Sequence, residues 1–396
     1  MANVSSSNGL EKRPKLRFPG FDEPWKETNL STLFSKSTQK NADGHITNVI
    51  CNSARLGLIP QREYFDKDIA NSDNTSGYYI IRQNDFVYNP RKSSDAPYGP
   101  ISSYKYAEDG IVSPLYLCFH AKGEINPLYY EWYFRSSAWH RYIYMSGDSG
   151  ARHDRVSIKD DTFFAMPINL PSELEQSKIA SFLQSLDERI AAQERLVASL
   201  KKYKRGVTEA IFTKDLRFTT KGAPYPQWDK KYVGDICKIQ TGKSNTQDET
   251  SQGSYPFYVR SPIVRKSNRY LFDCEAVLTV GDGVGTGKVF HYVTGKFDLH
   301  QRVYAMTDFK IVSGKYFYYY FSHFFYDRVM RMTAKTSVDS VRYEMIDKMT
   351  IQIPCHEEQQ QIVSFLDCLE HSVIEAEKTL NLLEKLKSGC LQQLFI

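Results

Sequence analysis

The sequence predicts an α+β fold, with two globular α+β domains separated by two long, antiparallel coiled-coil helices in a pseudo-two-fold arrangement. The first observation is a repeat: segment 171–212 recurs as 354–395 at one offset (362 − 179 = 183 for Ile179 and Ile362), without a gap. The second is the composition of the segments outside the repeat. They are rich in β-branched, aromatic and alternating stretches broken by Gly, Pro, Asn and Asp, which is typical of strands and turns. A long repeat indicates a duplicated structural unit.

Each copy of the repeat predicts one long helix. Its apolar residues follow alternating steps of four and three, which is the a/d seam of a heptad. The seam positions are Ile179, Leu183, Leu186, Ile190, Val197 and Leu200 in the first copy, and Ile362, Leu366, Leu369, Val373, Leu380 and Leu383 in the second. A proline precedes each helix, at Pro171 and Pro354, and Ser172 with Glu175 is typical of a capping box. About 42 residues at 1.5 Å each would form a rod of roughly 63 Å.

Two arrangements would bury this apolar stripe. Each helix could dock on the core of its own domain, or the two helices could pair with each other. We favour mutual pairing, because exposed apolar rods of this length are costly and each helix has an obvious partner in the other. Antiparallel pairing follows from the chain order, since the first helix leads into the second domain and the second helix leaves it.

The borders of the repeat divide the chain into five parts. The motif Leu16-Arg17-Phe18, followed by Pro24-Trp25, recurs as Leu216-Arg217-Phe218, followed by Pro226-Gln227-Trp228. We expect a flexible tail at 1–14, a first domain at 15–168, a first spacer helix at 169–213, a second domain at 214–351 and a second spacer helix at 352–396. Each domain also has one aromatic-rich stretch that fits a helix, at 126–145 and 315–332.

Composition restricts the class of protein. With 396 residues, of which 41% are hydrophobic, the chain has material for two cores. No apolar run approaches the roughly 20 residues that span a bilayer, and the first residues lack the apolar core of a secretory signal. We therefore expect a cytoplasmic protein. The 7 cysteines show no metal-ligand spacing, so we expect reduced thiols and no metal site. A net charge of +5 permits an anionic partner.

Catalytic motifs are not found. The glycine-rich run at Gly281–Lys288 is not a P-loop, because Asp282 stands where the first glycine is needed and Val289 replaces the Ser or Thr. The run at Tyr88–Arg91 differs from the N-P-P-Y loop of adenine methyltransferases, because Arg91 stands at the second proline. The 9 histidines form no H-E-x-x-H pattern. We therefore expect no catalytic residues.

Basic and polar side chains gather instead on turn-rich segments. Arg, Lys, Asn and Ser on loops are the residue types that contact phosphates and base edges, although any one of them could equally be a solvated surface residue. The candidates for DNA contact are Asn89, Arg91, Lys92, Ser93, Arg152, His153 and Arg155 in the first domain, and Lys243, Asn245, Arg260, Arg265, Lys266, Arg269, Lys288, Lys335, Ser337 and Arg342 in the second.

Two divergent domains, each followed by a copy of the repeated helix, closely resemble the specificity subunit of type I restriction-modification enzymes. The strongest marks are the P-x-x-x-EQ-x-x-I-x-x-FL start of both helices, the closing GCLQQLF at 389–395 and the duplication itself. Further marks are Gly110–Pro114 with Tyr116, and the glycine-rich segment Gly281–Phe290. The resemblance covers residues 15–396.

The resemblance implies a DNA-binding function without chemistry in this chain. Each domain would be a target recognition domain that reads one half of a bipartite, asymmetric DNA site, and the helices would fix the gap between the halves. It also implies two modification (methyltransferase) subunits, which carry S-adenosylmethionine, and restriction subunits, which use ATP and Mg. Two alternatives are a coiled-coil adaptor for partners other than DNA and a fused methyltransferase or nuclease.

Overall fold

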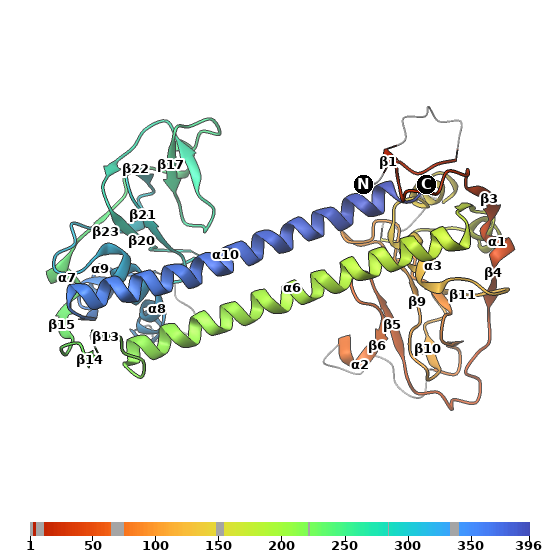
Figure 1. Ribbon diagram of the computed structural model, residues 1–396, viewed down its shortest axis with the longest axis horizontal. Coiled ribbons are helices and arrows are strands. Elements are labelled where there is room, and N and C mark those ends of the chain that lie inside the picture. The colour runs from red at the N-terminus through yellow and green to blue at the C-terminus, as the bar shows by residue number, and fades with distance from the viewer. Residues whose placement is uncertain are drawn as a thin grey trace. The chain divides into compact units, whose positions relative to one another are not determined.

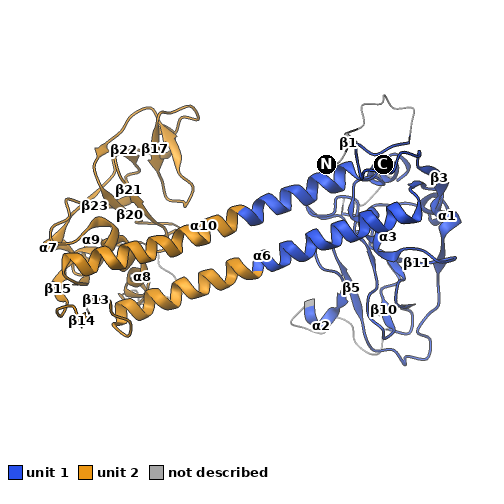
Figure 2. Ribbon diagram, viewed as in Figure 1, with its two compact units in different colours: residues 1–194, 379–396 blue, residues 195–378 orange. Residues whose placement is uncertain are grey.

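The computed structural model describes residues 3–4, 12–64, 75–147, 154–220, 222–283, 285–332 and 340–396. The chain forms two compact units, residues 1–194 with 379–396 (unit 1) and residues 195–378 (unit 2) (Figure 2). The division falls inside two long helices, α6 (Glu173–Thr213) and α10 (His356–Gln393). Each unit therefore contains one globular part and a portion of both helices, as the sequence predicts for an α+β protein of this type (Figure 1).

The globular part of unit 1 begins and ends on one strand pair, β3 (Lys26–Asn29) with β12 (Pro167–Leu170). Its main sheet is antiparallel in the order β4 (Phe34–Ser37), β11 (Leu117–Ala121), β8 (Phe86–Tyr88) and β9 (Ile101–Ser103). A second group contains the hairpin of β5 (Ile50–Ser53) with β6 (Gly57–Pro60), and the pair β7 (Tyr79–Ile81) with β10 (Gly110–Val112). A parallel bridge between Val49 and Ile111 joins them. The helices are α1 (Leu30–Leu33), α2 (Gln61–Tyr64), α3 (Pro127–Arg135), α4 (His140–Ser146) and α5 (Asp160–Phe164).

The globular part of unit 2 is closed by the pair β15 (Asp229–Tyr232) with β24 (Thr350–Ile353). Its main sheet has the order β16 (Lys238–Thr241), β23 (Val303–Thr307), β20 (Ala276–Val280) and β21 (Phe290–Val293). A second sheet has the order β18 (Arg265–Ser267), β17 (Tyr255–Tyr258), β22 (Lys296–Leu299) and β19 (Phe272–Asp273). The remaining elements are β13 (Thr219–Thr220), β14 (Ala223–Pro224), α7 (Val233–Ile236), the 3-10 turn η2 (Thr246–Asp248), α8 (Gly314–Met332) and α9 (Tyr343–Asp347).

The two globular parts share one topology although their sequences diverge. The main sheets β4-β11-β8-β9 and β16-β23-β20-β21 have the same strand order along the chain. The hairpin β5–β6 corresponds to β17–β18, and the parallel contact of β5 with β10 corresponds to that of β17 with β22. Because a sheet requires the pattern of buried side chains and not particular residues, the repeated fold survives where the repeated sequence does not.

The predicted N-terminal tail, 1–14, is only partly described. Asn3–Val4 form β1, which pairs antiparallel with β2 (Leu16–Arg17). The carbonyl of Lys12 accepts a hydrogen bond from the Trp25 N–H, and the Lys12 ammonium contacts the Glu27 carboxylate. The described residues of this segment thus contact the domain, and a flexible tail at 1–14 stays a prediction.

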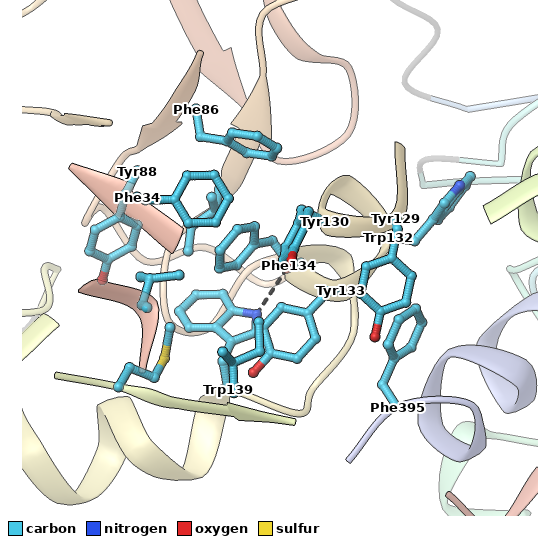
Figure 3. Close-up of a cluster of buried hydrophobic side chains, with 14 of the residues drawn as sticks. Phe34, Phe86, Tyr88, Tyr129, Tyr130, Trp132, Tyr133, Phe134, Trp139 and Phe395 are labelled. Atoms are coloured by element: carbon cyan, nitrogen blue, oxygen red, sulfur yellow. Dashed lines mark hydrogen bonds between the residues drawn. The ribbon is translucent and has the colours of Figure 1, made fainter. Parts of the chain in front are cut away.

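Aromatic side chains form the core of unit 1 (Figure 3). The ring of Phe34 meets Phe86 and Phe119 edge-on, at centroid distances of 5.4 and 5.3 Å. The aromatic stretch 126–145 forms two helices where the sequence suggested one. The break occurs at Ser136, whose extended backbone ends α3 and whose hydroxyl donates to the Tyr133 carbonyl. In unit 2, α8 supplies the corresponding aromatic residues as one helix.

The predicted apolar seam of α6 and α10 is shielded from solvent along its length. All twelve of the seam residues named above are buried or half-buried, whereas Leu196, Leu382 and Leu386 on other faces are exposed. In unit 2, Lys201 contacts Glu377 and Lys204 contacts Glu370, so the residue numbers rise on one helix as they fall on the other. The helices therefore run antiparallel.

The ends of the helices also pack in the domain cores. In unit 1, Ile179 and Leu183 of α6 share the domain core with Leu394 of α10. In unit 2, Ile362 and Leu366 of α10 share the core with Ile211 and Phe212 of α6. Mutual pairing of the helices therefore holds, and at the helix ends each stripe also enters a domain core, an arrangement that the sequence prediction had weighed as the alternative. Aromatic residues of α3 and α8 supply large apolar side chains in these cores.

Polar contacts repeat the internal symmetry. Lys204 pairs with Glu370 in unit 2, and Lys387 pairs with Asp187 in unit 1. The two pairs are related by the repeat offset of 183 residues. Lys204 corresponds to Lys387 (387 − 204 = 183), and Asp187 corresponds to Glu370 (370 − 187 = 183). Lys204 and Lys387 continue the steps of the seam, four residues after Leu200 and Leu383. Their ammonium groups reach a carboxylate on the other helix, so the two pairs favour one register of the helices.

A second symmetric pair fastens each domain border to its helix. Arg17 contacts Glu175 through Nε and Nη2, both at 2.8 Å, and Arg217 contacts Glu358 in the same bidentate way at 2.8 and 2.9 Å. Both glutamates are buried. The recurring Leu-Arg-Phe motif is thereby explained, because its arginine neutralises the buried carboxylate in the first turn of a long helix.

Replacement of the buried seam residue Leu183 tests the packing of the helix ends. Leu183→Ala removes a side chain that is 0% exposed, so the free energy of unfolding should fall by about 2–5 kcal/mol. Leu196→Ala, on an exposed face of the same helix, is the matched control and should change stability by less than about 0.5 kcal/mol. Chemical denaturation followed by circular dichroism measures both, and equal stability of the two variants would contradict this packing.

Candidate nucleic-acid interface

In unit 1 the predicted basic residues line one hollow of about 830 Å³. The β5–β6 hairpin tip, the loop after β8 and the turn before β11 form its walls. Five candidates from the sequence lie in it: Asn89, Arg91, Lys92, Ser93 and Arg155. The structure therefore brings together residues that are more than sixty positions apart in the chain (155 − 91 = 64).

Backbone hydrogen bonds create this juxtaposition. Arg91 and Arg155 form an antiparallel bridge, the Lys92 N–H donates to the Asp154 carbonyl at 2.8 Å, and the Val156 N–H donates to the Pro90 carbonyl at 2.9 Å. The loop after β8 is thus held along the strand-like segment that precedes α5. Arg152 and His153, also predicted, lie outside the described residues.

The five residues differ in how free their side chains are. The Asn89 amide donates to the Asn52 carbonyl at 3.3 Å, and its oxygen accepts the Arg91 N–H at 3.1 Å. Asn89 therefore holds the loop in place. Ser93 likewise accepts the Ala96 N–H in a turn. Arg91 and Lys92 are exposed, and within the described ranges no ion pair involves either, so both can contact phosphate oxygens or base edges.

Sequence reasoning missed part of this hollow. Its walls also include Asn52, Arg55, Leu56, Leu115 and Tyr116. Arg55 and Leu56 lie at the tip of the β5–β6 hairpin, where the sequence Ala54-Arg55-Leu56-Gly57 offered a turn signal. Leu115 and Tyr116 follow Ser113-Pro114, which was noted only as a family mark. Which of these turns faces the basic loop depends on strand pairing, and the sequence does not reveal it.

In unit 2 a shared carboxylate joins two arginines. Asp282 lies 3.4 Å from Arg260 Nη1 and 3.7 Å from Arg302 Nε. Next to it, the Gln301 amide donates to the Asn245 side-chain oxygen at 2.5 Å. Arg260 and Asn245 were candidates from the sequence, whereas Gln301 and Arg302 were missed because they lie in a stretch that looked like a strand.

The turn that carries Gln301 and Arg302 depends on a buried histidine. Burial, with the neighbouring Arg260 guanidinium, lowers the pKa of His300. Its imidazole is therefore neutral at pH 7, and Nδ1 accepts the Arg302 N–H at 3.0 Å. The backbone of His300 also forms a bridge with Ser244. These contacts fix the direction in which the two polar side chains leave the turn.

A buried carboxylate supports the same surface from below. Asp298 is fully buried and accepts hydrogen bonds from Ser244 Oγ at 2.6 Å, Ser267 Oγ at 2.9 Å and its neighbour's backbone N–H at 2.9 Å. Arg269 lies 3.6 Å from it and 2.8 Å from Asp248. Arg269, a predicted DNA contact, is therefore held by two carboxylates and stabilises the loop after β16.

The remaining candidates of unit 2 are spread over several elements. Lys243 and Lys266 are exposed, Arg265 lies 3.3 Å from Glu249, and Arg342 is exposed at the start of α9. Lys288 lies over the Tyr326 ring of α8 at 5.0 Å. The segment of Arg342 approaches the arginine cluster, because Ser340 bridges with Asp282. Lys335 and Ser337 lie outside the described residues.

Other kinds of site were also sought in the part of the chain that the structure describes. There, no group of three or more His, Cys, Asp and Glu residues is placed to hold a metal ion. No described helix is both long enough and apolar enough to span a membrane.

Removal of the Asp298 carboxylate tests its supporting role. Asp298→Ala should lower the free energy of unfolding by about 1.5–3 kcal/mol, the usual value for hydrogen bonds to a charged group. It should also increase amide hydrogen exchange at residues 243–249. Asp273→Ala, an exposed aspartate on β19, is the control and should leave both quantities unchanged. Unaltered exchange at 243–249 in Asp298→Ala would contradict the role.

Parts of the chain are similar in sequence to known proteins. Residues 226–387 match the family described as the type I restriction modification DNA specificity domain. The chain is 28% identical over 142 residues to the specificity subunit of the type I restriction enzyme EcoDI of Escherichia coli, covering 36% of this chain and 31% of that protein. It is 24% identical over 180 residues to the MjaVIII specificity subunit of Methanocaldococcus jannaschii, covering 42% of each. The matches thus span less than half of either relative.

Solved structures show the same fold over nearly the whole chain. The type I restriction-modification S subunit of M. genitalium aligns with a TM-score of 0.61 at 13% identity, covering 97% of this chain and 99% of that one. A chain from a structure of complex assembly in a type I system aligns with a TM-score of 0.57 at 17% identity, covering 94% and 97%. Residues 226–387 are thus similar to the type I restriction modification DNA specificity domain, and the chain shares the fold of these solved structures.

Proposed function

We propose that this chain selects the DNA sequence on which a type I restriction-modification complex acts, and that each globular domain reads one half of a bipartite, asymmetric site. One observation carries the proposal: a single sheet topology occurs twice, each time followed by a copy of the repeated helix, with different polar residues on its loops. Duplicated scaffolds with different loops suit a protein that reads two different half-sites, because loops supply the base contacts and the scaffold only orients them.

The two long helices fix the gap between the half-sites in this proposal. Support comes from their length of 41 and 38 residues and from their charged and apolar seam. Two readers on the same face of B-DNA must be separated by about one helical turn, roughly 34–36 Å, or a multiple of it. Stiff paired helices are suited to hold such a distance, whereas a flexible linker is not.

The same proposal assigns the chemistry to partner subunits. Two modification subunits with S-adenosylmethionine would flip and methylate the target adenines, and restriction subunits would use ATP and Mg. This chain would act in the cytoplasm without catalysis of its own. The purified chain should accordingly bind duplex DNA but show no methylation or cleavage by itself, and sequence-selective methylation by this chain alone would overturn the assignment.

The salt dependence of DNA binding tests the role of the free cations. A protein that neutralises phosphates releases counterions, and each contact contributes about −0.9 to the slope of log K against log salt. Lys92→Ala should therefore reduce the steepness of this slope by about 1. Lys178→Ala, on an exposed face of α6, should leave it unchanged. Fluorescence anisotropy with duplex DNA over a salt series measures the slopes, and identical slopes in all three proteins would exclude Lys92 as a phosphate contact.

Lengthening the helices tests the gap. One heptad inserted after Arg195 and a second after Lys378 would extend the paired helices by about 10.5 Å. The recognised gap should increase by roughly three base pairs, because B-DNA rises 3.4 Å per base pair. Mapping of methylated adenines in a genome that carries the altered gene, with its modification partner, gives the new site. An unchanged gap in a folded variant would show that the helices do not set the distance.

A further inference from the structure

Both domains carry exposed, branched apolar side chains at the same place in their shared topology. The β5–β6 hairpin of unit 1 corresponds to the β17–β18 hairpin of unit 2. At the first tip, Leu56 is 63% exposed, and at the second, Ile263 and Val264 are 62% and 43% exposed. The sequences of the two tips differ, so the common feature lies in the kind of side chain and its position.

The tip in unit 1 is fixed by short-range hydrogen bonds. The Ser53 hydroxyl accepts the backbone N–H groups of Arg55 and Leu56, each at 3.3 Å. Gly57 then closes the hairpin with φ of +72°, a conformation that residues with a Cβ rarely adopt. Leu56 is therefore presented to solvent by a preorganised turn.

A second exposed leucine lines the same hollow. Leu115 is 62% exposed, and its N–H donates to the Ser113 hydroxyl at 3.3 Å in the turn between β10 and β11. Leu56 and Leu115 both line the hollow that contains Arg91 and Lys92. Two exposed leucines thus lie in the same hollow as the exposed cations Arg91 and Lys92.

The charges beside these side chains indicate what covers them. Arg55 adjoins Leu56, and its ion pair with Asp95, at 3.2 Å, is largely exposed and therefore weak. In unit 2, Arg260 and Arg265 flank Ile263 and Val264. An apolar protein groove would not require these neighbouring cations, whereas the phosphates of DNA would. On the major-groove edge of DNA the apolar group is the C5-methyl of thymine.

We propose that the apolar hairpin tips read thymine methyl groups: Leu56, with Leu115, in the half-site of unit 1, and Ile263, with Val264, in the half-site of unit 2. This inference rests on the proposed function. The neighbouring arginines and Lys92 hold the phosphates, and the apolar side chains distinguish thymine from the other bases by packing against its methyl group. The two hairpins thereby serve the same purpose with different residues.

Substitution of thymine by deoxyuridine tests the inference, because it removes the methyl group and nothing else. The site is first identified by mapping methylated adenines, and each thymine of a duplex carrying it is then replaced singly. The intact chain should bind at least one such duplex in each half-site about fourfold more weakly, the effect of burying one methyl group. Leu56→Ala or Leu115→Ala should bind the unaltered and the substituted duplex of one half-site equally, and Ile263→Ala should do so for the other.

Controls separate this inference from structural damage and from the proposed function. Leu174→Ala, 78% exposed at the start of α6, should keep the full sensitivity to deoxyuridine, and thermal melts should show all variants folded. If the intact chain binds duplexes with and without its site equally, the proposed function itself fails. If it selects its site but no deoxyuridine weakens binding, or if the variants keep the sensitivity, only the methyl-contact inference fails.

A different apolar role has its own signature. Leucine side chains can also act as wedges between base steps, which kinks the duplex. In that case Leu56→Ala would weaken binding equally to thymine and deoxyuridine duplexes, and it would reduce the bend measured by circular-permutation gel shifts. That outcome would overturn the methyl contact.

Discussion

The burial of both ends of each long helix in a domain core is the constraint on which the rest of the structure depends. Ile179 and Leu183 at the start of α6, and Ile362 and Leu366 at the start of α10, are at most 1% exposed. Most of the stability of a helix in a protein comes from tertiary packing of its apolar face. Because the end of one helix joins the core that holds the start of the other, neither helix can shift without disrupting a domain.

Polar contacts then specify the register that apolar packing leaves loosely determined. Apolar seams tolerate slippage by a heptad, since similar side chains recur at each step. The pairs Lys204–Glu370 and Lys387–Asp187 occupy positions related by the repeat, so a slip would separate both at once. The buried pairs Arg17–Glu175 and Arg217–Glu358 fix the border of each domain on its helix in the same symmetric way. Where recognition depends on a fixed distance, such rigidity has a functional purpose.

The loops of the proposed recognition surfaces are stabilised differently from the long helices. In both domains a buried polar network holds the loops, with Asn52 beneath the hollow of unit 1 and Asp298 beneath the loops of unit 2. In the same domains, exposed cations and apolar tips face solvent. Loops that are rigid before binding lose less entropy when they bind.

The sequence by itself determined the duplication, the helices and their direction, and the α+β class, because the heptad seam and the strand patterns are local signals. It also located basic loops such as 89–93. Only the tertiary structure decided that Arg91 lies beside Arg155, that Asn89 and Arg269 hold loops in place, and that Leu56 and Leu115 face the same hollow. It also revealed the common topology of two domains with no alignable sequence. These features arise from strand pairing between distant residues, for which a single sequence carries no local signal.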